Sequence, residues 1–314
     1  MKQFLIVLLI GLLAASVQAQ TPEATPQPTP EVTTATGQSL FFDDFTYADS
    51  SHMADHGWIL RTAAGWPGIS GAIWSSDSIR IVEDPDQAGN RLVQMTASSD
   101  GTTIHQAQFC QQRKFFEGTY ATRLRWNDAP SSGPDGDNIV ETFYTISPLA
   151  FPLDPNYSEI DFEYLPNGGW GRNYNVLDVT SWETFSPEPN WIADNTSSSV
   201  ERSLDGWHTL VLQVANGQVK YYLDDRLLAV QGGKYYPEVP MSINYNLWFI
   251  DGGQIKSSDK RQYVEQVDWT FHAANTVLSP DDVSKQIAQM RSDKISFVDT
   301  VPPEDPPLTS PCNF

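Results

Sequence analysis

Short runs of alternating apolar and polar residues recur along the chain from residue 40 onward. In GTYATRLRW (118–126), Tyr120, Leu124 and Trp126 fall on one side of the run and two arginines on the other, which is typical of a strand with one buried face. WHTLVLQV (207–214) alternates in the same way. Turn-forming pairs such as Asn216-Gly217 separate these runs. Many short strands joined by turns predict an antiparallel sandwich or barrel, an all-β fold.

One segment near the end departs from the strand pattern. PDDVSKQIAQMRSD (280–293) begins with an acidic turn and places Val283, Ile287 and Met290 on one face of a helix. The proline-rich residues after it are unsuited to a central strand. We therefore expect a β domain at 39–275, followed at 276–314 by a helix and a proline-rich tail that pack on or near it.

The first 38 residues lack this periodicity. MKQFLIVLLIGLLAASVQAQ combines a lysine, an apolar run and small residues before Ala19, which is typical of a cleaved secretory signal peptide. We assign residues 1–19 to the signal and 20–38, rich in proline and threonine, to an extended linker. These features predict a secreted, extracellular protein.

Composition and charge narrow the range of partners. The chain is 40% hydrophobic and 12% aromatic, which suits a packed core. Its formal net charge of −20 would repel nucleic-acid phosphates and anionic membrane surfaces. A neutral ligand is compatible with this charge. We expect no nucleic-acid partner, no membrane insertion and a monomer.

The chain has two cysteines, Cys110 and Cys312. In an exported protein they either form a disulfide that ties the tail to the domain or remain two thiols. The distance along the sequence does not determine the Cα distance, so both alternatives stay open.

Three acids alternate with apolar residues in SEIDFEYLP (158–166). In a strand, Glu159, Asp161 and Glu163 would share one face, with an isoleucine and a phenylalanine on the other. Two simpler explanations for three alternating acids are a chance occurrence of the pattern and a solvent-exposed strand face in an acidic protein. The apolar flanks argue against both, because a strand buried on one side presents its acids to a cleft. Close acids raise at least one pKa, which suits a site that needs both an acid and a base.

Cleaving a glycosidic bond with retention needs two such carboxyl groups, a nucleophile and a proton donor, about 5–5.5 Å apart. Cα atoms four residues apart in a strand are roughly 13 Å apart, and two glutamates leaning together on a twisted sheet could close much of this gap. An aspartate between them could share hydrogen bonds with the nucleophile and help to keep the donor protonated.

EIDFEYLP resembles the active-site strand of glycoside hydrolase family 16, the concanavalin A-like β-jelly-roll enzymes. The resemblance implies a sandwich of two antiparallel sheets with a concave substrate cleft. It also implies an endo-acting retaining hydrolase of a β-glucan, with β-1,3-1,4 or β-1,3 linkages favoured and no cofactor required. Segments that resemble further family strands, in order, cover most of residues 40–273: EGTYATRLRW, NIVETFYTIS, DGWHTLVLQVANGQVKYYLDDRLL, PMSINYNLWF and YVEQVDWTF.

Carried over by position, the resemblance implies that Glu159 is the nucleophile, Asp161 an electrostatic helper and Glu163 the acid/base. The unbulged E-x-D-x-E spacing is similar to the lichenase and xyloglucan-enzyme form of the family, whereas laminarinases typically carry an extra residue. Asn246 and Trp248 match residues that contact sugar in lichenase-like members.

Aromatic rings on which sugars can stack supply further candidates, although core packing is the alternative for each of them. Tyr157 stands where many family members have tryptophan, and Cys110 stands where lichenases have a polar sugar contact. A glycan at the sequon of Asn156 would obstruct the cleft, which favours a bacterial source. The aromatic candidates are Trp66, Trp74, Tyr144, Tyr157, Trp170, Trp182 and Tyr245.

Family members often carry a structural calcium ion on the convex face, for which Asp43, Asp44 and Asp268 are candidate ligands. Three other functions remain open: a transglycosylase on the same site, a non-catalytic carbohydrate-binding module, and a calcium-dependent adhesion domain that uses the acids as a metal site.

Overall fold

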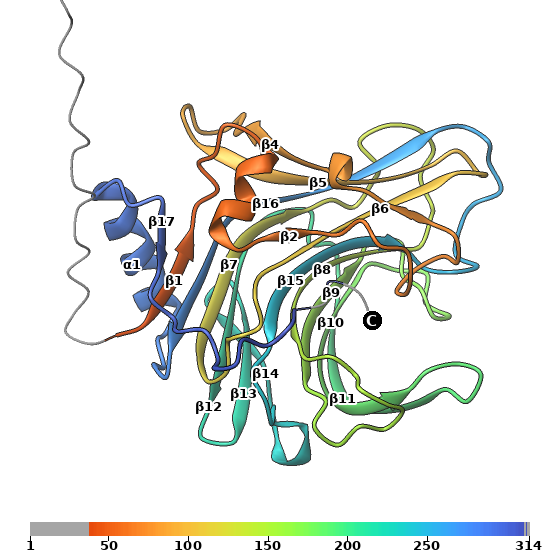
Figure 1. Cartoon of the computed structure of the whole chain (residues 1–314). Helices are drawn as coiled ribbons and strands as arrows, with labels where there is room; N and C mark the ends of the chain where they lie inside the picture. Colours follow the sequence, from red (N-terminus) through yellow and green to blue (C-terminus); the bar gives the residue numbers. More distant parts are fainter. Residues whose placement is uncertain (1–37, 311, 313–314) are drawn as a thin grey trace, which may run out of the picture. The chain divides into compact units, whose positions relative to one another are not determined.

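The computed structural model describes residues 38–310 and 312, so the expected signal peptide and nearly all of the expected linker lie outside the described residues. The described part consists mainly of strands that form two facing sheets joined through shared edges (Figure 1). No helix in this part is long and apolar enough to cross a membrane.

One sheet is strongly curved in Figure 1, and we call it the concave sheet. Its neighbouring strands are all antiparallel. In spatial order they are β2 (Ile59–Leu60), β6 (Ile104–Cys110), β15 (Ser242–Phe249), β8 (Ile139–Ile146), β9 (Glu159–Leu165), β10 (Val176–Ser186) and β11 (Ile192–Glu201).

The second, convex sheet packs behind the first. Its strands in order are β4 (Ile79–Glu83), β5 (Arg91–Ser99), β16 (Arg261–Ala274), β7 (Gly118–Trp126), β12 (Gly206–Ala215), β13 (Gln218–Leu223) and β14 (Arg226–Gly232). β1 (Leu40–Asp43) pairs with both β16 and β17 (Phe297–Asp299), and β3 (Ile73–Trp74) pairs in parallel with β6. The predicted all-β sandwich of two antiparallel sheets is confirmed.

Helices are few in the described part. α1 (Pro280–Ser292) starts at a capping box in which Ser279 and Asp282 bond to each other's backbone N–H groups. Its buried side chains include the three apolar residues that the sequence places on one face. Three short 3-10 helices span Ser50–His56, Ser76–Ser78 and Gly233–Tyr235.

The core between the sheets explains the orientation of β9. Ile160 and Phe162 are each 1% exposed, and the Phe162 ring packs against Phe143 of β8 and Tyr221 of β13. A register slip of one residue would exchange these side chains with the acids between them. The core contacts of β9 therefore fix its acids on the concave face.

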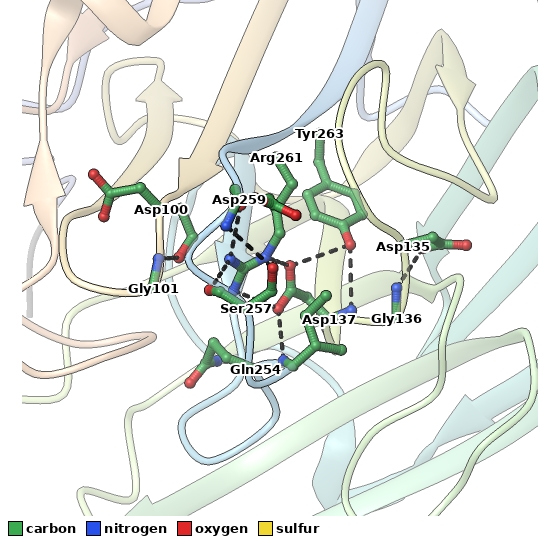
Figure 2. A network of polar contacts seen from close by, with 12 residues as sticks. Asp100, Gly101, Asp135, Gly136, Asp137, Gln254, Ser257, Asp259, Arg261 and Tyr263 are labelled. Carbon is green, nitrogen blue, oxygen red and sulfur yellow. Dashed lines mark hydrogen bonds and ion pairs between the residues drawn. The ribbon is translucent and has the colours of Figure 1, made fainter.

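A buried ion pair joins the loop before β8 to the first residue of β16 (Figure 2). Asp137 and Arg261 are fully buried and form two hydrogen bonds, from Nε at 2.5 Å and from Nη2 at 2.9 Å. Asp137 also accepts from the backbone N–H of Ile255 at 2.9 Å. Arg261 donates to the carbonyl of Ser257 at 3.1 Å. With the remaining lone pairs and protons satisfied, such a pair can hold the loops in one arrangement.

A second cluster of buried acids has no ion-pair partner among the described residues. Glu141 of β8 and Glu265 of β16 are both 0% exposed. One oxygen of Glu141 and both oxygens of Glu265 lack a hydrogen-bond partner among the described residues. Burial raises the pKa of each carboxyl well above its usual value, and the nearby Glu265 raises the pKa of Glu141 further. The folded protein therefore favours the protonated acids.

This preference predicts a loss of stability as the pH rises. A carboxyl whose pKa is raised by folding contributes its full stabilisation below its unfolded pKa, about 4.3 for Glu, and this stabilisation is lost as the pH rises from there through the folded pKa. We expect Glu265→Gln, which stays neutral, to raise the melting temperature on the order of 2–4 °C at about pH 8 and less at about pH 5. Thermal melts at both pH values test this, with exposed Glu188→Gln as the matched control. An equal shift at both pH values would contradict the explanation.

Candidate active site

The three acids, which we call the acidic ladder, lie side by side on the concave face of β9. β9 pairs residue for residue with β8 and with β10, without a register shift along Glu159–Leu165. The unbulged spacing predicted from the sequence is therefore confirmed. All three acids line one hollow in the concave sheet. The other lining residues are Trp66, Pro67, Thr142, Tyr144, Asn246 and Trp248.

Glu159 is held by a tyrosine behind it. The hydroxyl of Tyr157 donates to Oε2 of Glu159 at 2.6 Å. Burial raises the pKa of Glu159 to about 7, and the Tyr157 hydrogen bond opposes this rise because it favours the ionised form. Tyr157 itself is 0% exposed. The structure thus places this predicted substrate contact behind the carboxylate, where it positions Glu159.

Asp161 sits at the centre of the ladder. The indole Nε1–H of Trp182 donates to its Oδ2 at 2.8 Å. Burial, followed by the charges of Glu159 and Glu163, raises the pKa of Asp161 well above its usual value. Trp182, predicted as a sugar contact, therefore uses its polar edge to hold Asp161.

Glu163 retains its proton to a higher pH than Glu159. Burial raises the pKa of Glu163 to about 8, with further increases from the charges of Glu159 and Asp178, while Arg172 lowers it. Asp178 lies directly opposite Glu163 on β10 and forms two hydrogen bonds with Arg172, at 2.9 and 2.5 Å. The guanidinium therefore offsets part of the negative field around Glu163. Nothing in the sequence pattern had singled out this pair.

A polar chain crosses the floor of the hollow from β2 to β8. Arg61 Nη1 donates to Gln108 Oε1 at 2.7 Å, and Gln108 Nε2 donates to the hydroxyl of Tyr144 at 2.9 Å. Asn246 Nδ2 donates to the same hydroxyl at 3.3 Å. Since Tyr144 accepts both bonds, its own proton is free to donate. Asn246 Oδ1 is buried and has no partner among the described residues.

Aromatic side chains flank the hollow at both ends of the ladder. Trp66, 49% exposed, lies over the hollow with its ring 6.0 Å from Phe185 of β10. Phe185 also packs on exposed Trp191, at 5.7 Å, which the sequence did not suggest. At the other end, Trp170 is 55% exposed and its ring is 6.3 Å from Trp248.

Two of the aromatic candidates are structural. Trp74 is 3% exposed and lies under the guanidinium of Arg61, at 3.8 Å, while its Nε1–H donates to the carbonyl of Gly65. It supports the loop that carries Trp66. Tyr245 is 0% exposed, and its hydroxyl donates to Thr122. It precedes Asn246 in β15, and because successive residues of a strand face opposite sides, Tyr245 faces the core. Neither residue lines the hollow.

The candidate calcium ligands are engaged by other groups. Asp43 accepts from Trp58 Nε1 at 2.7 Å and from the backbone N–H of Phe45 at 2.8 Å. Asp268 accepts from Arg123 and Arg291, each at 2.7 Å. Within residues 38–310 and 312, no group of three or more His, Cys, Asp or Glu side chains is placed to hold a metal ion.

Structural comparison identifies the fold. A glycoside hydrolase family 16 endo-glucanase from Bacteroides ovatus aligns over 73% of this chain and 98% of its own, with a TM-score of 0.54 and 14% identity. A lichenase from a mouse hindgut metagenome aligns over 74% of this chain and 98% of its own, with a TM-score of 0.52 and 16% identity. The κ-carrageenase of Pseudoalteromonas carrageenovora aligns over 79% of this chain and 99% of its own, with a TM-score of 0.51 and 13% identity. No family sequence model and no curated protein sequence matches the chain. The predicted β-jelly-roll fold of the family 16 enzymes is confirmed.

The contacts of Glu163 predict how its proton affinity responds to mutation. Arg172→Met removes the positive charge that lowers the pKa of Glu163 and leaves Asp178 uncompensated. We expect the pKa of Glu163 to rise above its value of about 8. Carbon-detected NMR titration of the side-chain carboxyls measures this. Exposed Arg202→Met is the matched control. A pKa that stays constant or falls in Arg172→Met would show that Arg172 does not act on Glu163.

Proposed function

We propose that this chain is a secreted, endo-acting, retaining glycoside hydrolase of a β-glucan. The acidic ladder carries the proposal: an unbulged strand presents one buried and two partly buried acids to a hollow, and the two glutamates differ in proton affinity. Retaining cleavage needs such a pair, one ionised and one protonated. The fold shared with known glycoside hydrolases supports the same conclusion.

In the proposed first step, Glu163 donates its proton to the glycosidic oxygen while ionised Glu159 attacks the anomeric carbon. The bond to the leaving sugar breaks and a glycosyl ester forms on Glu159. In the second step, Glu163, now ionised, takes a proton from water, and the oxygen of that water attacks the anomeric carbon and releases Glu159. Burial and the flanking glutamates raise the pKa of Asp161, which favours its protonated form, and that form can donate a hydrogen bond to Glu159 as the leaving carboxylate forms.

The hollow is suited to a neutral sugar. Asn246 Oδ1 provides an unpaired acceptor and the Tyr144 hydroxyl a free donor, while Trp66 and Trp248 provide ring surfaces. These contacts make Asn246, Tyr144 and Trp248, predicted from the sequence, the proposed substrate-binding residues. Trp170 extends this wall beside Trp248. A β-1,3-1,4- or β-1,3-linked glucan is the proposed substrate, and a transglycosylase that transfers the sugar to another chain is the second candidate on the same residues.

Substituting either glutamate tests the catalytic roles. We expect Glu159→Gln and Glu163→Gln each to lower kcat/KM by about 10²–10⁴-fold or more, with melting temperatures that are not reduced. Reducing-sugar assays on mixed-linkage glucan and laminarin, with products sized by mass, measure the rate and separate hydrolysis from transfer. Glu188→Gln, on the exposed surface, serves as the control. Near-normal turnover in either ladder variant would refute the proposal.

The two pKa values predict a bell-shaped pH profile. Activity should increase as Glu159 loses its proton near pH 7 and decrease as Glu163 loses its proton near pH 8. Tyr157→Phe removes a hydrogen bond that lowers the pKa of Glu159, so the acidic limb should move to higher pH while the alkaline limb stays. Profiles of kcat/KM for both proteins test this. Movement of the alkaline limb alone would instead make Glu159 the proton donor and Glu163 the nucleophile.

A further inference from the structure

Cys110 lies in the same cross-strand row of the concave sheet as Asp161. Direct pairs connect Asp161 to Tyr144, Tyr144 to Asn244, and Asn244 to Cys110. Directly paired residues of antiparallel strands place their side chains on the same face. Cys110 therefore faces the same side as the acidic ladder. It is three strand spacings away from Asp161, roughly 14 Å.

The C-terminal tail covers Cys110. Cys110 and Cys312 form a disulfide with a Cα–Cα distance of 5.9 Å, which decides between the two alternatives left open by the sequence. Cys110 is 0% and Cys312 2% exposed. The hydroxyl of Ser310 donates to the carbonyl of Gln111 at 2.6 Å. In Figure 1 the dark blue chain after β17 runs to the hollow side of the concave sheet.

The polar floor of the site continues toward this tail. Asn246 and Asn244 are successive concave-facing residues of β15, and each has a buried Oδ1 without a partner among the described residues. Asn246 lines the hollow. Asn244, 0% exposed, stands between Tyr144 and Cys110 in the row. An unpaired buried acceptor is costly unless a ligand or solvent donates to it.

Apart from the disulfide, the tail has few attachments. Residues 302–307 are exposed, and beyond them Leu308 forms a single isolated bridge with Arg113. Ser310 contributes the hydrogen bond to Gln111, the residue that follows β6. Prolines at 302, 303, 306 and 307 cannot donate backbone hydrogen bonds. The Cys110–Cys312 bond is therefore the main constraint that holds the tail on the sheet.

We propose that the disulfide-bound tail ends the substrate cleft on the β6 side, and that freeing the tail opens one more sugar position at Asn244. This inference rests on the proposed glycoside hydrolase function. While the disulfide is intact, sugar units beyond β15 meet the tail in place of the sheet. The Cys110–Cys312 bond, which is remote from the acids, therefore sets how many sugar units the cleft binds and how large the products are.

The test compares the wild-type protein with Cys312→Ser on one β-glucan that the wild type cleaves. We expect the variant to shift the product distribution to longer oligosaccharides by at least one sugar unit and to lower KM for long but not for short oligosaccharides. Ser310→Ala, which keeps the disulfide, is the matched control and should give wild-type products. Circular dichroism melts confirm that the compared proteins are folded at the assay temperature.

Reversible reduction provides a second arm that does not depend on how the variant folds. Dithiothreitol converts the disulfide to two thiols and is itself oxidised, so wild-type protein should acquire the longer products when reduced and lose them after reoxidation. Unchanged products in both arms, from an enzyme that does cleave a glycan, would overturn this inference alone. Failure of the wild type to cleave any glycan in the panel would overturn the proposed function, and this inference with it.

Discussion

The burial of Ile160 and Phe162 is the constraint on which the site depends. These two side chains pack into the core between the sheets, and strand alternation then leaves the intervening acids no position except the concave face. In the neighbouring strands, side chains alternate between the core and the concave face in the same way. Asn246 faces the hollow because Tyr245 faces the core, and Tyr144 faces it because Phe143 does not. The surface that carries the ladder is thus specified by hydrophobic contacts on its reverse side.

The fold accommodates buried carboxyl groups in two different ways. Asp137 has a dedicated cation in Arg261 and several hydrogen bonds (Figure 2), so it remains a structural anion. The ladder acids and the Glu141–Glu265 pair have no cation bonded directly to them among the described residues, and their pKa values rise. In the proposed mechanism the ladder uses that rise, because Glu163 serves there as the proton donor. The Glu141–Glu265 pair has the same electrostatic character without access to the hollow.

The sequence was sufficient for features that repeat with a fixed period. The core-facing positions of β7 and β12, the buried face of α1 and the spacing of the ladder follow from local rules, and each is present in the structure. Contacts between distant segments could not be predicted in this way. The pairing of Arg172 with Asp178 beside Glu163 and the packing of Trp66 on Phe185 depend on how loops return to the sheet. Tyr157 was predicted as a sugar contact from its position before the ladder, whereas its side chain is buried and its hydroxyl donates to Glu159.

The pairing of β1 with β17 has a consequence for the order of folding. Leu40–Asp43 is the first strand of the domain and Phe297–Asp299 the last, yet they are neighbours in the convex sheet. The sheet therefore reaches its complete set of contacts only after nearly the whole chain has been synthesised. Such non-local pairing delays folding relative to translation. A chain that remains incompletely folded until its last strand emerges is well matched to passage through an export channel, which the first residues of the sequence predict.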